Sequence, residues 1–115
     1  MKPRIATVSL AGCFGCHMSL LDIDQRLFEL IELVDFDKSP LDDFKQFTRR
    51  CAIGFIEGGV ASDENLHTLQ GFRKNCDLLV SVGECACQGD IPSMRNPLAL
   101  REIFETSYLG GPTTD

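Results

Sequence analysis

The chain has 115 residues and a mass of 12.7 kDa, enough for one domain with a hydrophobic core but too short for two ordinary domains. Hydrophobic residues make up 43% and charged residues 24% of the sequence, which excludes disordered and fibrous classes. The formal net charge of −6 argues against nucleic acid or an anionic membrane as a partner, because both select clustered lysine and arginine.

The compartment decides how the six cysteines of the chain are interpreted. The N-terminus carries no apolar run of signal-peptide length and no twin-arginine pair, and no run of 18 apolar residues occurs. We therefore expect a cytoplasmic protein without a membrane span. In that reducing compartment, clustered cysteines are more often metal ligands or redox thiols than disulfides.

The first third of the chain predicts a strand, a cysteine-bearing loop and a helix. Residues 5–10 form a β-branched, apolar run typical of a buried strand, and Cys13 and Cys16 follow in the next loop. Apolar residues then recur at spacings of three and four, which predicts one helix over residues 17–34 with a strand-like end near 34–36.

The middle of the chain predicts a surface connection, a second strand and a second helix. Residues 37–50 are polar and alternate in charge, so we expect a surface segment with at most one short helical turn. Residues 51–57 form the second buried run, closed by Gly58-Gly59. Ser62 is then placed to cap a helix that ends near Asn75.

The last third predicts a third strand, a second cysteine-bearing loop and a final helix. Residues 76–82 form the strand, and the loop over residues 84–95 carries Cys85 and Cys87. Asn96-Pro97 is expected to cap a helix that runs to about residue 108, since proline suits the first helical position.

Strand, loop and helix thus repeat three times, which predicts an α/β fold with a parallel sheet and crossover helices. In such sheets, ligands collect at the carboxyl ends of the strands. We expect three loops to converge there: the one with Cys13 and Cys16, the Gly58-Gly59 turn, and the one with Cys85 and Cys87.

The cysteine spacing favours a metal site and leaves its type open. A Cys-x-Gly-Cys loop lets two thiolates face one metal, while Gly15 permits a close backbone approach. The loop with Cys85 and Cys87 can supply the remaining ligands of an iron–sulfur cluster, which is held by four thiolates. The same spacing also fits half of a structural zinc site or a redox-active dithiol.

Two further cysteines and an apolar stripe are interpreted as structural. Cys51 and Cys76 each begin an apolar run, where a buried cysteine is usually part of the core. Met18, Leu21 and Phe28 form a stripe that belongs to the core or to an interface, and the core is favoured.

Two polar residues near the cysteine loops have an open interpretation. His17 follows Cys16 directly, so it is either a ligand or hydrogen-bond donor to the cluster, or a first-turn residue facing solvent or a partner. Glu57 ends the second strand, where it is either a satisfied strand-end carboxylate or a group that handles protons or offers oxygen to iron.

Together these motifs resemble the small subunits of nickel–iron hydrogenases, specifically the short subunit of the NAD-reducing, bidirectional type. Four segments carry the resemblance, and their order along the chain is more specific than any one of them: AGCFGCHMSLLD (11–22), IEGG (56–59), GECA (83–86) and IPSMRN (91–96). The resemblance implies a flavodoxin-like fold and a proximal [4Fe-4S] cluster beside a nickel–iron site in a separate large subunit.

The resemblance also implies the ligand set. Cys13, Cys16 and Cys85 match three cluster ligands, whereas the family's fourth ligand lies in a downstream Gly-Cys-Pro segment that the sequence does not contain. We therefore expect residues 1–115 to form a single iron–sulfur-binding domain, the N-terminal part of a longer subunit. Otherwise another group completes the site: Cys87, Cys51 or Glu57.

By the same resemblance, the chain is an electron relay in a hydrogen dehydrogenase and is inactive alone. Electrons would pass from the large subunit to iron–sulfur and flavin diaphorase subunits that carry FMN and bind NAD. The alternatives are an iron–sulfur subunit of a complex I type quinone reductase and a zinc-binding structural module. The quinone reductase subunit has adjacent cysteines, whereas two residues separate Cys13 from Cys16.

Overall fold

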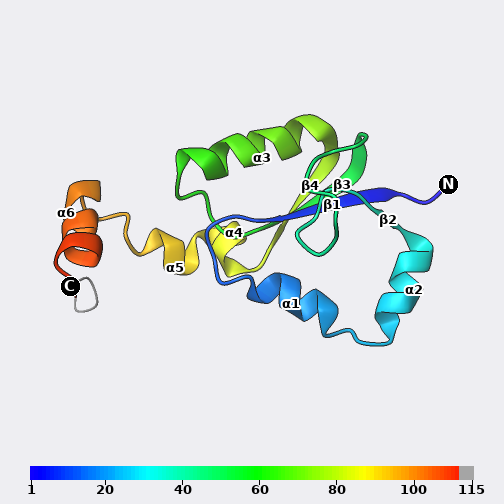
Figure 1. The fold of residues 1–115 in the computed structure, drawn as a ribbon, viewed down its shortest axis with the longest axis horizontal. Helices are drawn as coiled ribbons and strands as arrows, with labels where there is room; N and C mark the ends of the chain where they lie inside the picture. The colour runs from blue at the N-terminus through cyan, green and yellow to red at the C-terminus, as the bar shows by residue number, and fades with distance from the viewer. Residues whose placement is uncertain (112–115) are drawn as a thin grey trace.

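Four parallel strands form one sheet, and their order confirms the predicted fold class. In this computed structural model, which describes residues 1–111, the order is β2-β1-β3-β4 (Figure 1). The strands are β1 (Arg4–Ser9), β2 (Asp35–Phe36), β3 (Cys51–Glu57) and β4 (Cys76–Val82). This is the flavodoxin-like order as far as its fourth strand. The last four positions of the predicted 1–115 domain lie outside the described residues.

The register of the strands brings their carboxyl ends level. Ser9 at the end of β1 pairs with Glu57 at the end of β3, and Glu57 pairs in turn with Val82 at the end of β4. The loops that follow these strands therefore start from one edge of the sheet. The chain adds β2 on one side of β1 and then β3 and β4 on the other side, so the strand order reverses between β1 and β3. The carboxyl ends of these two strands are therefore the topological switch point, where ligands bind in such folds.

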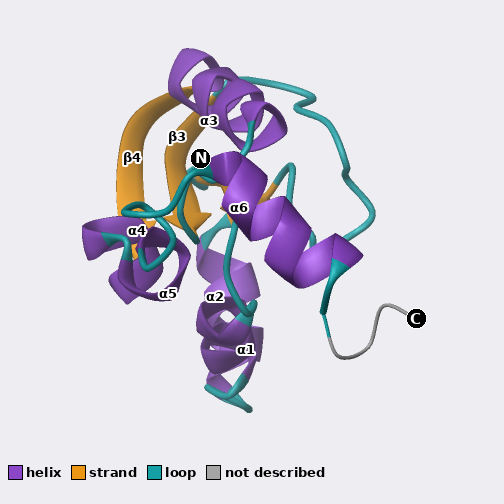
Figure 2. Cartoon of the chain, turned by 90° about the vertical axis from the view of Figure 1, so that its left-hand side faces the viewer, coloured by secondary structure: helices purple, strands orange, loops and turns teal. Residues whose placement is uncertain are grey.

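Helix α3 (Asp63–Asn75) covers one face of the sheet, as Figure 2 shows for β3 and β4. Its predicted cap and end are confirmed, because the side chain of Ser62 accepts a hydrogen bond from the Asn65 amide at 3.1 Å. Phe72 is fully buried with Cys51 and Cys76 in the core cluster. The structural interpretation of these two cysteines is therefore confirmed.

The opposite face carries two helices, so the prediction of one helix over residues 17–34 is wrong. Helices α1 (Gly15–Leu21) and α2 (Arg26–Leu33) are separated by turns, and Asp24 there adopts a left-handed conformation with φ of 57°. Aspartate tolerates this conformation better than most residues, because its short polar side chain can bond locally. The chain consequently bends between the two helices.

These two helices leave the sheet face beneath them incompletely covered. A hollow of about 460 Å³ lies there, and its lining is mainly apolar side chains of both helices and of β1 and β3. Of the two assignments for Met18, Leu21 and Phe28, the favoured one to the core is wrong, since all three are exposed; the assignment to an interface stays a prediction. The apolar stripe is on α1 and α2 as the periodicity indicated, but part of it faces outward.

The segment over residues 37–50 is not wholly at the surface, which corrects the prediction. Asp37 and Ser39 are buried. Asp37 accepts hydrogen bonds from the amide and hydroxyl of Thr48, and the hydroxyl of Ser39 lies 2.6 Å from that of Thr7 on β1. Buried polar groups need such partners, and these bonds attach the segment to the sheet.

After β4 the chain is more helical than predicted. The expected loop over residues 84–95 contains the short helices α4 (Glu84–Gln88) and α5 (Asp90–Ser93). The last helix begins later than predicted: α6 (Leu100–Phe104) continues into the π-helix η1 (Glu105–Leu109). Pro97 lies in the preceding turns, where Leu98 donates to the carbonyl of Arg95.

Figure 1 shows α5 and α6 extending away from the sheet, beyond the carboxyl ends of the strands. Within residues 1–111, no helix is long and apolar enough to cross a membrane.

Candidate metal centre

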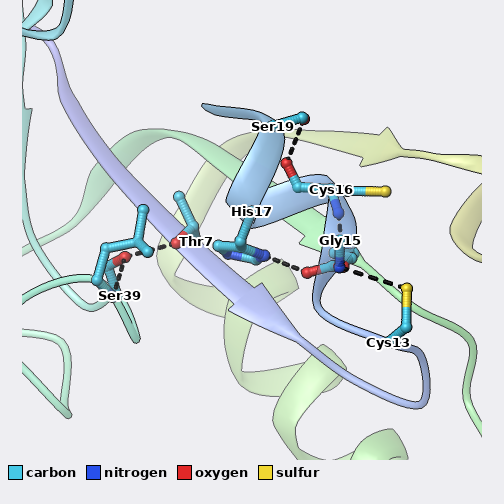
Figure 3. A network of polar contacts seen from close by, with 9 residues as sticks. Thr7, Cys13, Gly15, Cys16, His17, Ser19 and Ser39 are labelled. Carbon is cyan, nitrogen blue, oxygen red and sulfur yellow. Dashed lines mark hydrogen bonds and ion pairs between the residues drawn. The ribbon is translucent and has the colours of Figure 1, made fainter. Parts of the chain in front are cut away.

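The first cysteine loop is fixed to the end of β3. Ala11 and Gly59 exchange two backbone hydrogen bonds, of 3.0 and 2.8 Å, so the loop after β1 is joined to the turn after β3. Cys13 is exposed, and its sulfur accepts a hydrogen bond of 3.4 Å from the amide of Gly15 (Figure 3). Cys16 follows in the first turn of α1 and is half-buried.

The second cysteine loop meets the first through a glycine. Gly83 follows β4 with φ of 86° and ψ of 167°, a conformation essentially restricted to glycine. A Cβ added at Gly83 would overlap the sulfur of Cys16. The absence of a side chain at Gly83 therefore gives the Cys16 sulfur its place beside the loop that carries Cys85 and Cys87.

The geometry of the loops confirms that they converge at this edge, as predicted. The bridge between Ala11 and Gly59 joins the first two loops, and the contact of the Cys16 sulfur with Gly83 joins the first to the third. Burial raises the pKa of the Cys16 thiol, and repulsion from the Glu57 carboxylate and from the ionised thiols of Cys13, Cys85 and Cys87 raises the pKa further.

The side chains at this edge include several thiols, the ligand type of iron–sulfur clusters. Thiolates are the ligands of such clusters, and each one binds a different iron atom, so the sulfurs stand further apart than around one ion. In the described part of the chain, no three side chains of histidine, cysteine, aspartate or glutamate are grouped closely enough to hold a single metal ion. Cys13, Cys16 and Cys85 would hold three of the iron atoms.

Glu57 lies directly beneath the first cysteine loop. Its carboxylate is buried, and Oε1 accepts a hydrogen bond of 3.1 Å from the amide of Cys16. Oε2 accepts from Nδ1 of His17. Both oxygens of Glu57 are thus hydrogen-bonded to consecutive residues of α1.

His17 does not face solvent, and one of its ring nitrogens contacts Glu57. It is buried, it bonds Glu57, and its ring stacks on that of Phe14 with centroids 4.7 Å apart and planes 6° from parallel. Among residues 1–111, its ring nitrogens make no hydrogen bond to a cysteine sulfur, and the ring does not face solvent. The only sequence signal for this pair is a histidine next to a cysteine and a glutamate at a strand end.

Cys51 cannot complete the site. It begins β3, whereas the site lies at the other end of that strand, about 20 Å away at roughly 3.3 Å per residue. Burial, followed by repulsion from Asp37, raises the pKa of the Cys51 thiol to about 12. A thiol of this kind is inert, so the suggestion that Cys51 is a ligand is wrong.

Comparison with known proteins places this arrangement in a family. Residues 13–109 match the family described as NADH ubiquinone oxidoreductase, 20 Kd subunit. The chain belongs to this family. The matched region contains all the cysteines and Glu57, and the broader family predicted from the sequence motifs is confirmed.

Individual relatives include hydrogenase subunits. The chain is 49% identical to the delta subunit of the NAD-reducing hydrogenase HoxS of Cupriavidus necator, over 97% of this chain and 54% of that protein. It is 35% identical to one subunit of the F420-non-reducing hydrogenase of Methanothermobacter marburgensis, over 98% of this chain and 37% of that protein. The chain thus spans about half the length, or less, of these relatives.

A solved structure has the same fold. A chain in the crystal structure of an NAD⁺-reducing [NiFe]-hydrogenase in the H₂-reduced state superposes with a TM-score of 0.92 and 46% identity. The match covers 98% of this chain and 63% of that chain. At this similarity the extended α5 and α6 belong to the shared fold.

Proposed function

We propose that the chain binds one [4Fe-4S] cluster through Cys13, Cys16 and Cys85. The observation that carries the proposal is the meeting of the two cysteine loops at Gly83, where the Cys16 sulfur occupies the space that a side chain would fill. The fourth ligand is either Cys87, which lies on the short helix α4 together with Cys85, or a residue outside this sequence. The bound cluster supplies a one-electron carrier.

We further propose that the chain is the electron-relay small subunit of a cytoplasmic NAD-reducing nickel–iron hydrogenase. In this role it connects the nickel–iron site of a large subunit with iron–sulfur and flavin diaphorase subunits that carry FMN and bind NAD. The 49% identity to the HoxS delta subunit supports this assignment. The chain alone is not expected to oxidise H₂.

The exposed surface of the segment from α5 to η1 supports an assembly with partner chains. Large apolar side chains are exposed from α5 through α6 to the end of η1, which is unusual for a protein that acts alone. These side chains are Ile91, Met94, Leu98, Leu100, Phe104, Tyr108 and Leu109.

Metal analysis and ligand substitution test the cluster. The protein purified anaerobically from its source should contain equal iron and acid-labile sulfide, and Cys13→Ala or Cys85→Ala should lose both together with H₂-driven NAD⁺ reduction. Cys76→Ala is the matched control, because Cys76 lies in the core away from the site and should keep its iron. A Cys13→Ala protein with full iron and turnover would contradict the ligand assignment.

Cys87→Ala decides the fourth ligand. Loss of iron in this variant assigns Cys87, whereas full iron content assigns a residue outside the sequence. A colourless parent protein with one zinc ion would instead favour the zinc-binding structural module.

The second candidate is an iron–sulfur subunit of a complex I type quinone reductase, which the family description favours. The separation of Cys13 from Cys16 by two residues weighs against it. The two candidates differ in their reaction: H₂-dependent NAD⁺ reduction by the purified assembly supports the hydrogenase, and NADH-dependent quinone reduction without H₂ oxidation supports the alternative.

A further inference from the structure

Glu57 and His17 form a buried pair directly behind a proposed cluster ligand. Glu57 is 3% and His17 6% exposed, although both are polar. The pair joins the end of β3 to the first turn of α1, two elements 40 positions apart in the sequence. Burial of two such groups is costly unless each satisfies the other, so their contact is a defined feature of this edge.

Helix α1 depends on Glu57 because it has no cap of its own. Its N-cap residue, Phe14, adopts a left-handed conformation with φ of 66° and makes no side-chain cap hydrogen bond. The first amides of a helix lack partners within the helix, and Glu57 satisfies that of Cys16 from the neighbouring strand. A carboxylate at this position also suits the positive end of the helix dipole.

The backbone of Cys16 is held on both sides. Its amide donates to Glu57 at 3.1 Å, and its carbonyl accepts from the hydroxyl of Ser19 at 2.6 Å (Figure 3). The Cys16 sulfur lies against the backbone of Gly83. With the amide, the carbonyl and the sulfur all in contact, a displacement of Glu57 would move the sulfur relative to the other thiols.

His17 holds Glu57 through one of its ring nitrogens. Nδ1 bonds Oε2 of Glu57, while Nε2 is buried without a hydrogen-bond partner in the part of the chain that the structure describes. The ring of Phe14 lies flat on the imidazole and fixes its plane. The single polar contact of the buried ring is therefore the one to Glu57.

We propose that Glu57 is a positioning residue for the cluster ligand Cys16, and that His17 in turn holds Glu57. This inference rests on the proposed [4Fe-4S] cluster. Neither residue touches iron in this role. The pair sets the direction of the Cys16 thiolate, and hence the geometry and redox properties of the bound cluster.

Two substitutions of His17 separate its hydrogen bond from its ring. His17→Asn places an amide nitrogen near the position of Nδ1 and keeps the bond to Glu57, but it removes the ring that stacks on Phe14. His17→Phe keeps a ring for the stack and removes the bond. Each variant is purified as the assembled protein, and its iron content, its electron paramagnetic resonance spectrum in the reduced state and its midpoint potential are compared with the parent.

We expect His17→Phe to change the spectrum and shift the midpoint potential, and His17→Asn to resemble the parent. A parent-like spectrum and potential in His17→Phe overturns the proposal. An equal change in both variants also overturns it, because the bond to Glu57 that His17→Asn keeps would then preserve nothing.

Two substitutions of Glu57 carry the test if His17→Phe does not fold. Glu57→Gln keeps an oxygen that can accept from the Cys16 amide and should have a spectrum close to that of the parent, whereas Glu57→Ala should have an altered one. A parent-like Glu57→Ala overturns the proposal, and so does loss of the fold in both Glu57→Ala and His17→Phe, because the pair would then serve folding. A parent protein without iron refutes the proposed function itself, whereas a parent with a cluster and unchanged variants refutes only this positioning role.

Discussion

Substitution of Gly83 by alanine tests whether the contact between the two cysteine loops forms the metal centre. The added methyl group would overlap the sulfur of Cys16, and the backbone at position 83, with φ of 86° and ψ of 167°, is strained for any residue with a Cβ. A conformation of this kind costs about 1–3 kcal/mol in a residue other than glycine. Displacement of the Cys16 thiolate should also weaken metal binding. Substitution of a group that orients a metal ligand lowers metal affinity by about 10-fold or more, and we expect a loss of that size here.

Two glycines serve as matched controls. Gly89 also has a positive φ, of 93°, but a Cβ there would meet Ser93 rather than a thiol. Gly71 lies in α3 with nothing within 4 Å of an added Cβ. Gly89→Ala should therefore lose stability by a similar amount and keep its iron, and Gly71→Ala should gain about 0.5–1 kcal/mol from the better helix propensity of alanine.

The assay is iron and acid-labile sulfide per protein after anaerobic purification, followed by urea unfolding of each variant. We expect Gly83→Ala alone to lose both iron and stability. Full iron content and a parent-like reduced-state spectrum in Gly83→Ala would refute the assignment of this contact to the metal centre. Equal loss of iron in Gly89→Ala would attribute the effect to backbone strain instead.

Three further predictions concern the stability of the fold. Phe72→Ala should cost about 3–5 kcal/mol in urea unfolding, because the side chain is fully buried; a cost below about 1 kcal/mol would contradict its place in the core. Cys51 should make the free energy of unfolding of the parent fall as pH rises from 9.0, the ordinary pKa of a thiol, to about 12. The expected slope is about 1.4 kcal/mol per pH unit, because the thiol ionises in the unfolded chain and keeps its proton in the folded one. Unfolding of Cys51→Val over the same range should lack this part of the slope, and identical slopes would contradict the burial of the thiol. Burial alone would raise the pKa of Asp37, but hydrogen bonds, chiefly from Thr48, outweigh burial and lower the pKa. The ionised Asp37 therefore stabilises the folded chain at a pH above its pKa in the unfolded chain, and this stabilisation is lost as pH falls through its pKa in the folded chain. Thr48→Val should reduce this contribution in acid unfolding, and an unchanged profile below pH about 4 would count against it.

Local patterns in the sequence determined the strands, the fold class and the second helix. Apolar runs closed by glycine predicted β1, β3 and β4 within one residue, because strand formation here depends on neighbouring side chains that are buried together. Ser62 predicted the start of α3, because a helix cap is also local: its side chain bonds an amide only three residues away.

Local patterns failed where a single backbone angle or a turn decides the element. The apolar periodicity runs through residues 17–34, but α1 ends at Leu21, and the left-handed Asp24 in the following turns changes the chain direction before α2. Asn96-Pro97 has the composition of a helix start, yet the turns before it delay α6 until Leu100. Periodicity reports which residues are apolar, and it does not report where the helix axis bends.

The cysteine motifs and the parallel topology were enough to predict that the loops with Cys13, Cys16 and Cys85 meet at one edge of the sheet. Only the tertiary structure decided how they meet. The fit of the Cys16 sulfur against Gly83 joins residues 67 positions apart in the numbering, and the pair of Glu57 with His17 joins residues 40 positions apart. Contacts over such separations depend on the register of β1 with β3 and of β3 with β4, which no local pattern of residues encodes.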